Sequence, residues 1–169
     1  DKALINLSNQ VSSYLFSQLA KPSVAHFKTQ PGLVARAVCG HILSVGVECF
    51  PRGEMGDALA GFVLNPLASS PDGLRVYYWL YPYWDQVLVR AMSILPRFGS
   101  PPAVVSLIKY MPLAFLVVWR PDSNLNFPYP NLIEYIPSEV GGFSEIPLDF
   151  TVVPPHRYPE MPTSKGIAL

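Results

Sequence analysis

The chain has 169 residues, and only 14% of them are charged, against roughly 25% in an average globular domain. Its formal net charge is zero, so we expect no nucleic-acid partner and no general attraction to an anionic membrane. The longest uncharged stretch, residues 3–20, contains eight Asn, Ser and Gln residues and therefore does not predict a transmembrane segment. We expect a single domain over residues 1–169, and the low charge favours a surface covered by a protein partner or by self-association.

The first predicted element is an amphipathic helix over residues 4–19, which ends before Pro22. Its apolar side chains recur at three- and four-residue steps, and they are Leu4, Leu7, Val11, Tyr14, Leu15 and Leu19. The opposite face carries Asn, Ser and Gln without a charge. Such a face is typical of a helix that packs against protein, and it also occurs on helices that lie on a lipid surface.

Three strands are predicted after this helix. Residues 33–50 are almost continuously apolar and also fit a helical spacing, but their glycines and β-branched side chains favour a strand. Residues 58–65 predict a second strand. Residues 74–81 predict a third, after the turn signal at Ser70–Gly73. Together the three strands predict an antiparallel meander.

Two helices and a further strand are predicted next. The apolar stripe over residues 84–95 ends at a proline, as a helix does. Ser100 followed by Pro101 is a typical helix start for residues 100–110. Residues 113–119 are apolar on both faces, which is typical of a central strand.

The last 49 residues contain nine of the 19 prolines, together with many large apolar side chains. Because such side chains are unfavourable in water, we expect residues 121–169 to pack as an ordered, extended wrap on a body formed by residues 1–120. A short strand is predicted at Leu148–Val153. The predicted fold class is therefore α+β, with a mainly antiparallel sheet, two or three helices and a proline-rich C-terminal wrap.

No local catalytic signature occurs in the chain, and we predict no catalytic residues. Cys39, His41 and Cys49 could suggest a metal site or a nucleophile, but on a strand they share a face with aliphatic residues, as core side chains do. A strand of ten residues spans roughly 33 Å, so we predict two unbridged thiols, at least one of them buried. We expect a reducing, cytoplasmic location, no metal site and no cofactor.

The segment Tyr77–Trp84 holds six aromatic residues in eight positions. Pro82 cannot donate to a sheet, so we expect the strand to end there and to place the following side chains at the rim of the sheet. We predict a binding site for a peptide or a small polar ligand, formed by Tyr81, Tyr83, Trp84, Asp85 and Arg75. The alternative is that all of these rings fill the core.

These features favour a non-catalytic protein-interaction or assembly domain, because charge is scarce and aromatic residues and prolines are plentiful. One alternative is an enzyme, a hydrolase or transferase that draws on His41, Glu48, Asp57 and Asp85. A further alternative is peripheral membrane attachment through the first helix. An enzyme requires a pocket where such polar groups converge, an interaction domain requires an exposed apolar surface, and a membrane binder requires the apolar face of residues 4–19 to be exposed.

Overall fold

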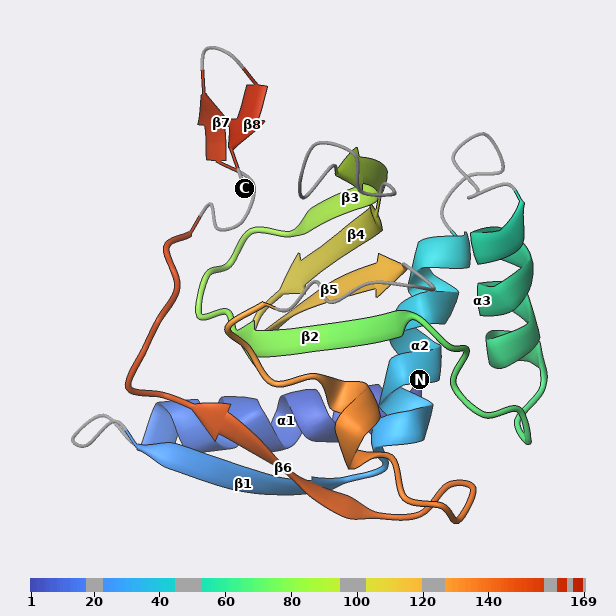
Figure 1. Cartoon of the computed structure of the whole chain (residues 1–169). Coiled ribbons are helices and arrows are strands. Elements are labelled where there is room, and N and C mark those ends of the chain that lie inside the picture. The colour runs from blue at the N-terminus through green and yellow to red at the C-terminus, as the bar shows by residue number, and fades with distance from the viewer. Residues whose placement is uncertain are drawn as a thin grey trace.

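The structure is a computed structural model, and it describes residues 1–17, 23–44, 53–94, 103–119, 127–156, 161–163 and 166–168. Within these residues, three α-helices and two two-stranded sheets accompany a larger four-stranded antiparallel sheet, which confirms the predicted α+β class (Figure 1). The elements are α1 (Lys2–Ser17), β1 (Val24–Thr29), α2 (Pro31–Ser44), α3 (Glu54–Leu64), β2 (Leu74–Leu80), β3 (Val87–Ile94), β4 (Ala103–Tyr110), β5 (Leu113–Trp119), the 3-10 helix η2 (Leu132–Tyr135), β6 (Ser144–Asp149), β7 (Met161–Thr163) and β8 (Gly166–Ala168).

The larger sheet has four strands in the order β2-β5-β4-β3, and every pairing in it is antiparallel. β5 lies between β2 and β4, and all of its side chains are buried. The predicted interior strand at residues 113–119 is therefore confirmed. β1 pairs with β6 in a second antiparallel sheet, and the Tyr78 hydroxyl links the two sheets by donating to the carbonyl of Pro147 at 2.9 Å.

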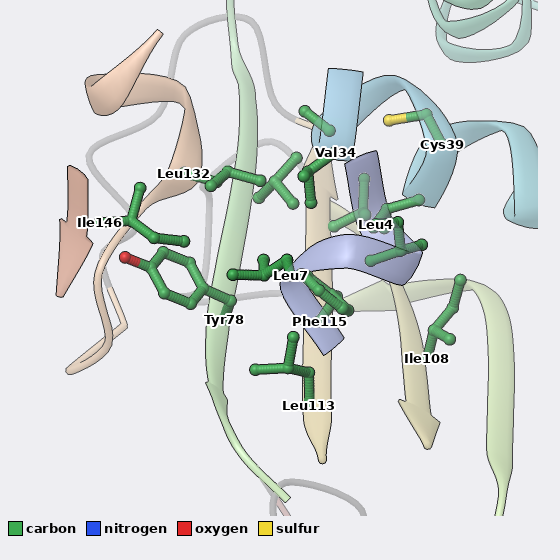
Figure 2. Close-up of a cluster of buried hydrophobic side chains, with 14 of the residues drawn as sticks. Leu4, Leu7, Val34, Cys39, Tyr78, Ile108, Leu113, Phe115, Leu132 and Ile146 are labelled. Atoms are coloured by element: carbon green, nitrogen blue, oxygen red, sulfur yellow. The ribbon is translucent and has the colours of Figure 1, made fainter. Parts of the chain in front are cut away.

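The larger sheet carries a hydrophobic core on each of its faces. Alternation along β2 sends Val76, Tyr78 and Leu80 toward the helices, where they pack with side chains of α1 and α2. Figure 2 shows this core, with Leu7 of α1 beside Phe115 of the sheet. Tyr77, Trp79 and Tyr81 point to the opposite face and form a second cluster with side chains of β4 and β5.

The predicted strands at residues 33–50 and 58–65 are wrong, because residues 33–44 lie in α2 and residues 58–64 lie in α3. In α2 the buried side chains are Pro31, Val34, Ala35, Val38, Cys39 and Ile42, a helical spacing that outweighs the β-branched content. α3 buries Met55, Leu59 and Phe62 at the same spacing, with acidic residues in its first turn. Residues 45–50, including Cys49, lie outside the described residues.

The predicted helices at residues 84–95 and 100–110 are also wrong, because Val87–Ile94 form β3 and Ala103–Tyr110 form β4. Burial in β4 extends over both faces, so pairing with β5 on one side and β3 on the other overrides the helical stripe. A β-bulge between Val89 and Met92 shifts the register of β3. The apolar residues of this strand therefore do not alternate strictly along the sequence. The helix over residues 4–19 and the strand over residues 74–81 are confirmed as α1 and β2, within two residues at the described ends.

The C-terminal third contributes both strands and irregular segments. β6 begins at Ser144, four residues before the predicted strand at Leu148, and its partner β1 was not predicted. The carbonyl of Pro130 accepts from the Tyr78 amide at 3.2 Å, so this part of the chain lies along the outer edge of β2. Part of residues 121–169 lies outside the described residues, and the wrap as a whole stays a prediction. Within the described part of the chain, no helix has the length and apolar character that crossing a membrane requires.

Arg36 joins α2 to the end of α3. Its guanidinium donates to the carbonyls of Phe62, Asn65 and Ala68, with the bond to Asn65 at 2.8 Å. It also lies over the Phe62 ring, 4.2 Å from the centroid. The last carbonyls of a helix lack partners within the helix, and a cation at this end interacts favourably with the negative end of the helix dipole.

We therefore expect Arg36→Lys to lower the free energy of unfolding by about 1–3 kcal/mol, because an ammonium group cannot span the three carbonyls that the guanidinium fork reaches. Urea unfolding of the full chain measures this change. Lys2→Ala, at an exposed cation on α1, is the control and should change the value by less than about 0.5 kcal/mol. Equal effects of the two substitutions would contradict a capping role for Arg36.

Candidate binding surface at the β2–β3 corner

Four of the five predicted site residues lie on the connection between β2 and β3, and the fifth, Arg75, lies within β2. Tyr81 is 1% exposed, Tyr83 is half-buried and Trp84 is 83% exposed. Arg75 lies at the opposite end of β2, where its guanidinium donates to the carbonyl of Leu74 at 2.9 Å. The structure therefore brings Tyr81, Tyr83 and Asp85 together, turns Trp84 outward and leaves Arg75 apart.

We call Tyr81, Tyr83, Asp85 and Lys109 the aromatic corner. The Tyr81 hydroxyl donates to Asp85 Oδ1 at 2.7 Å, and the rings of Tyr81 and Tyr83 meet edge to face at a centroid distance of 5.1 Å. Lys109, on β4, is 1% exposed, and its Nζ lies 4.9 Å from the centroid of the Tyr81 ring. The quadrupole of this ring offsets part of the cost of burying the ammonium group.

Residues from the C-terminal segment complete the aromatic corner. His156 Nε2 lies 2.7 Å from Asp85 Oδ2, and the His156 ring lies edge-on to Tyr83 at 4.7 Å. The Lys109 ammonium donates to the carbonyl of His156 at 2.8 Å. The Tyr83 hydroxyl donates to the carbonyl of Pro154 at 3.1 Å. Sequence reasoning missed both Lys109 and His156, because no local spacing relates them to Asp85.

The charges of the aromatic corner hold chain segments together. The hydrogen bond from the Tyr81 hydroxyl, followed by that from His156, keeps the pKa of Asp85 below its ordinary value. The donors of Tyr83 and Lys109 are engaged with backbone carbonyls. With its groups used in this way, the corner fixes the connection that carries Trp84.

On the other side of this connection lies an open groove of 990 Å³ between α1 and the β3–β4 half of the sheet. Four large apolar side chains in its lining are exposed: Ile5 by 55%, Phe16 by 59%, Trp84 by 83% and Leu88 by 41%. We call this the α1–β3 groove. Leu88 and its cross-strand partner Ile108 belong to the helix-facing side of the sheet, so the groove lies where the helical layer ends before the edge strand β3.

Two buried hydroxyls also line the α1–β3 groove. The Oγ of Ser8 and the hydroxyl of Tyr110 are shielded from water, and neither makes a hydrogen bond of normal geometry. Burial raises the pKa of Tyr110, while the neighbouring Ser8 hydroxyl lowers it by a smaller amount. The two hydroxyls are therefore neighbours beneath the surface of the groove and are not donors open to a ligand.

The residues of the enzyme hypothesis do not converge. His41 Nε2 lies 3.6 Å from Oδ1 of Asp1, which precedes α1, Asp57 is exposed on α3, and Asp85 belongs to the aromatic corner. Glu48 lies outside the described residues. Cys39 is a free thiol with no exposed surface, and burial raises its pKa to about 12, which makes it unreactive. The described residues contain no group of three or more His, Cys, Asp and Glu side chains that could hold a metal ion.

Comparison of the chain with protein families, with curated proteins and with solved structures finds no match. Function must therefore be inferred from the geometry of the two neighbouring surfaces.

The lowered pKa of Asp85 predicts how the aromatic corner responds to acid. Ionised Asp85 stabilises the folded chain above the ordinary Asp pKa of about 4, and this contribution is lost as the pH falls through the lower pKa of the folded state. We expect Asp85→Asn to melt at a lower temperature than the wild type at pH 7, and the difference to shrink below about pH 4. Thermal unfolding followed by circular dichroism measures both effects.

Glu139→Gln, at an exposed carboxylate outside the aromatic corner, is the matched control and should leave the melting temperature almost unchanged at pH 7. A difference between Asp85→Asn and the wild type that stays constant from pH 7 to pH 3 would contradict the assigned contacts.

Proposed function

We propose that this chain is a non-catalytic protein-interaction domain that docks an amphipathic helix of a partner protein in the α1–β3 groove. The observation that carries the proposal is the convergence of Ile5, Phe16, Trp84 and Leu88, all exposed, on one open groove. Contiguous exposed apolar side chains mark interaction surfaces, and tryptophan is among the commonest binding anchors.

The position of the α1–β3 groove suits a helix. Its floor includes Leu88 and Ile108 of the sheet, and its wall is α1, so an added helix would lie beside α1 in the same layer. An α-helix is about 10 Å across and rises 5.4 Å per turn, so the volume of 990 Å³ accommodates about two turns. Apolar side chains at positions i, i+3, i+4 and i+7 of the partner helix would face the floor.

The charges around the α1–β3 groove define the partner further. Asp1 and His41 lie close to each other within the lining, and most of the remaining side chains are apolar or neutral. Lys109 is buried and engaged with the aromatic corner. A partner helix therefore needs an apolar, uncharged face, since Asp1 already pairs with His41 and Lys109 is engaged with His156.

The alternative functions receive less support from the geometry. An enzyme requires convergent polar groups, and His41, Asp57 and Asp85 lie on separate elements. The membrane alternative requires the predicted apolar face of residues 4–19 to be exposed, whereas Leu4, Leu7 and Val11 of that face are at most 4% exposed. Self-association stays a second candidate, because the same groove could accept a helix from another copy of the chain.

A synthetic amphipathic helix of 16 residues, with leucine at positions i, i+3, i+4 and i+7 and only Ala, Ser, Gln and Asn elsewhere, tests the proposal. We expect the peptide to shift the fluorescence of Trp84 to shorter wavelength. We expect Leu88→Lys to weaken binding by at least about tenfold, because the complex would bury an unpaired ammonium group.

Leu67→Lys introduces the same charge at a side chain that is 76% exposed and outside the groove lining, and it should leave the affinity unchanged. Equal affinities of the two lysine variants would contradict docking in the α1–β3 groove. A wild-type dimer that Leu88→Lys converts to monomers in light scattering would identify the partner as a second copy. Binding to phosphatidylcholine vesicles that Leu88→Lys abolishes would favour the membrane alternative.

A further inference from the structure

A short proline-containing segment of the chain is seated on the aromatic corner. Pro154 is buried there, whereas the preceding Val152 and Val153 are 59% and 47% exposed and the following Pro155 is exposed. The carbonyl of Pro154 accepts from Tyr83, and the carbonyl of His156 accepts from Lys109. A buried proline between exposed neighbours and two carbonyls on alternate residues therefore mark the contact.

These contacts are the ones by which proteins recognise extended proline-rich peptides. Aromatic side chains provide a surface for the proline ring, and side-chain donors bond the carbonyls, which such a peptide leaves free because it has no internal hydrogen bonds. The imidazole of His156 adds a contact of its own, because it reaches Asp85 at 2.7 Å and lies beside the rings of Tyr81 and Tyr83, at centroid distances of 6.2 and 4.7 Å. In this chain the sequence held at the aromatic corner is therefore Pro-x-His, at residues 154–156.

The arm that delivers this segment is exposed. Thr151, Val152 and Val153 follow β6, and Figure 1 shows the chain rising from the end of β6 past the β2–β3 connection. The side-chain hydroxyl of Thr151 donates to Asp149 within the same stretch, 2.5 Å away. Because β6 is held by its pairing with β1, residues 154–156 can leave the aromatic corner without breaking either sheet.

We propose that the aromatic corner is a binding site for an extended, proline-rich segment of a partner protein, and that residues 154–156 of the chain occupy it as a built-in competitor. The site shares Lys109 with the lining of the α1–β3 groove, but its other residues lie outside that lining and its contacts do not involve Trp84. A tethered segment acts at an effective concentration in the millimolar range, so it lowers the apparent affinity for any free segment.

The test uses the full chain with Pro154→Ala and His156→Ala, which removes the proline ring and the imidazole of the competitor, keeps its backbone carbonyls, and leaves Tyr81, Tyr83, Asp85 and Lys109 unchanged. A labelled peptide of residues 150–158 is the probe, and fluorescence anisotropy measures its binding. We expect this double variant to bind the peptide at least about tenfold more tightly than the wild type. A peptide carrying the same two alanines should bind at least about tenfold more weakly than the native peptide.

Tyr83→Phe, added to the double variant, should weaken binding about fivefold because the donor to the Pro154 carbonyl is lost. Tyr135→Phe, on η2, is the matched control and should have no effect. Equal binding of the native and alanine peptides, or no effect of Tyr83→Phe, would overturn the proposal.

A measurement on the wild type covers the case in which the double variant does not fold. An excess of the unlabelled peptide should move the imidazole proton signals of His156 in the NMR spectrum to the positions seen in the free peptide. Signals that stay in place at millimolar peptide would overturn the proposal. A wild-type dimer that the peptide dissociates would overturn the choice of an unlike partner, because a second copy would then supply the segment.

Discussion

The structure depends on one constraint: a sheet that is apolar on both faces must be covered on both sides. Every side chain of β5 is buried, and β2 alternates between two separate cores. Helices α1 and α2 cover one face. On the other face the rings of Phe127 and Tyr129 lie 5.2 and 4.9 Å from those of Tyr77 and Trp79. Antiparallel sheets often expose one face to water, but here both faces of β5 are buried.

The two candidate surfaces lie where this covering ends. On the helical side the cover stops before the edge strand β3, and the α1–β3 groove results. On the opposite side residues 154–156 complete the cover at the aromatic corner. Both surfaces share the connection between β2 and β3, since Asp85 is held in the corner while the adjacent Trp84 lines the groove. A ligand on either surface would therefore contact the same connection between β2 and β3.

The elements that were predicted correctly from the sequence are those whose hydrophobic pattern fits only one type of secondary structure. α1 shows a single apolar stripe between polar faces, and β5 is apolar throughout and short, so both were predicted correctly. α2 and β4 were not, because apolar residues on most positions satisfy a helix and a strand equally well, and tertiary pairing decides between them. The rim position of Tyr81, Tyr83 and Asp85 followed from Pro82. Their contacts with Lys109 and His156 join residues distant in sequence, which no local pattern reveals.

The three tryptophans of the chain test this account most directly, because each reports on a different part of the cover. Trp119 lies on the helical side at 8% exposure, Trp79 on the opposite side at 3%, and Trp84 in the α1–β3 groove at 83%. Quenching of fluorescence by acrylamide, a neutral molecule, measures access to each ring. We predict that Trp84→Phe removes nearly all of the quenchable emission in the folded chain. Quenching that persists in Trp84→Phe would show that one face of the sheet is open to water, which would contradict the account.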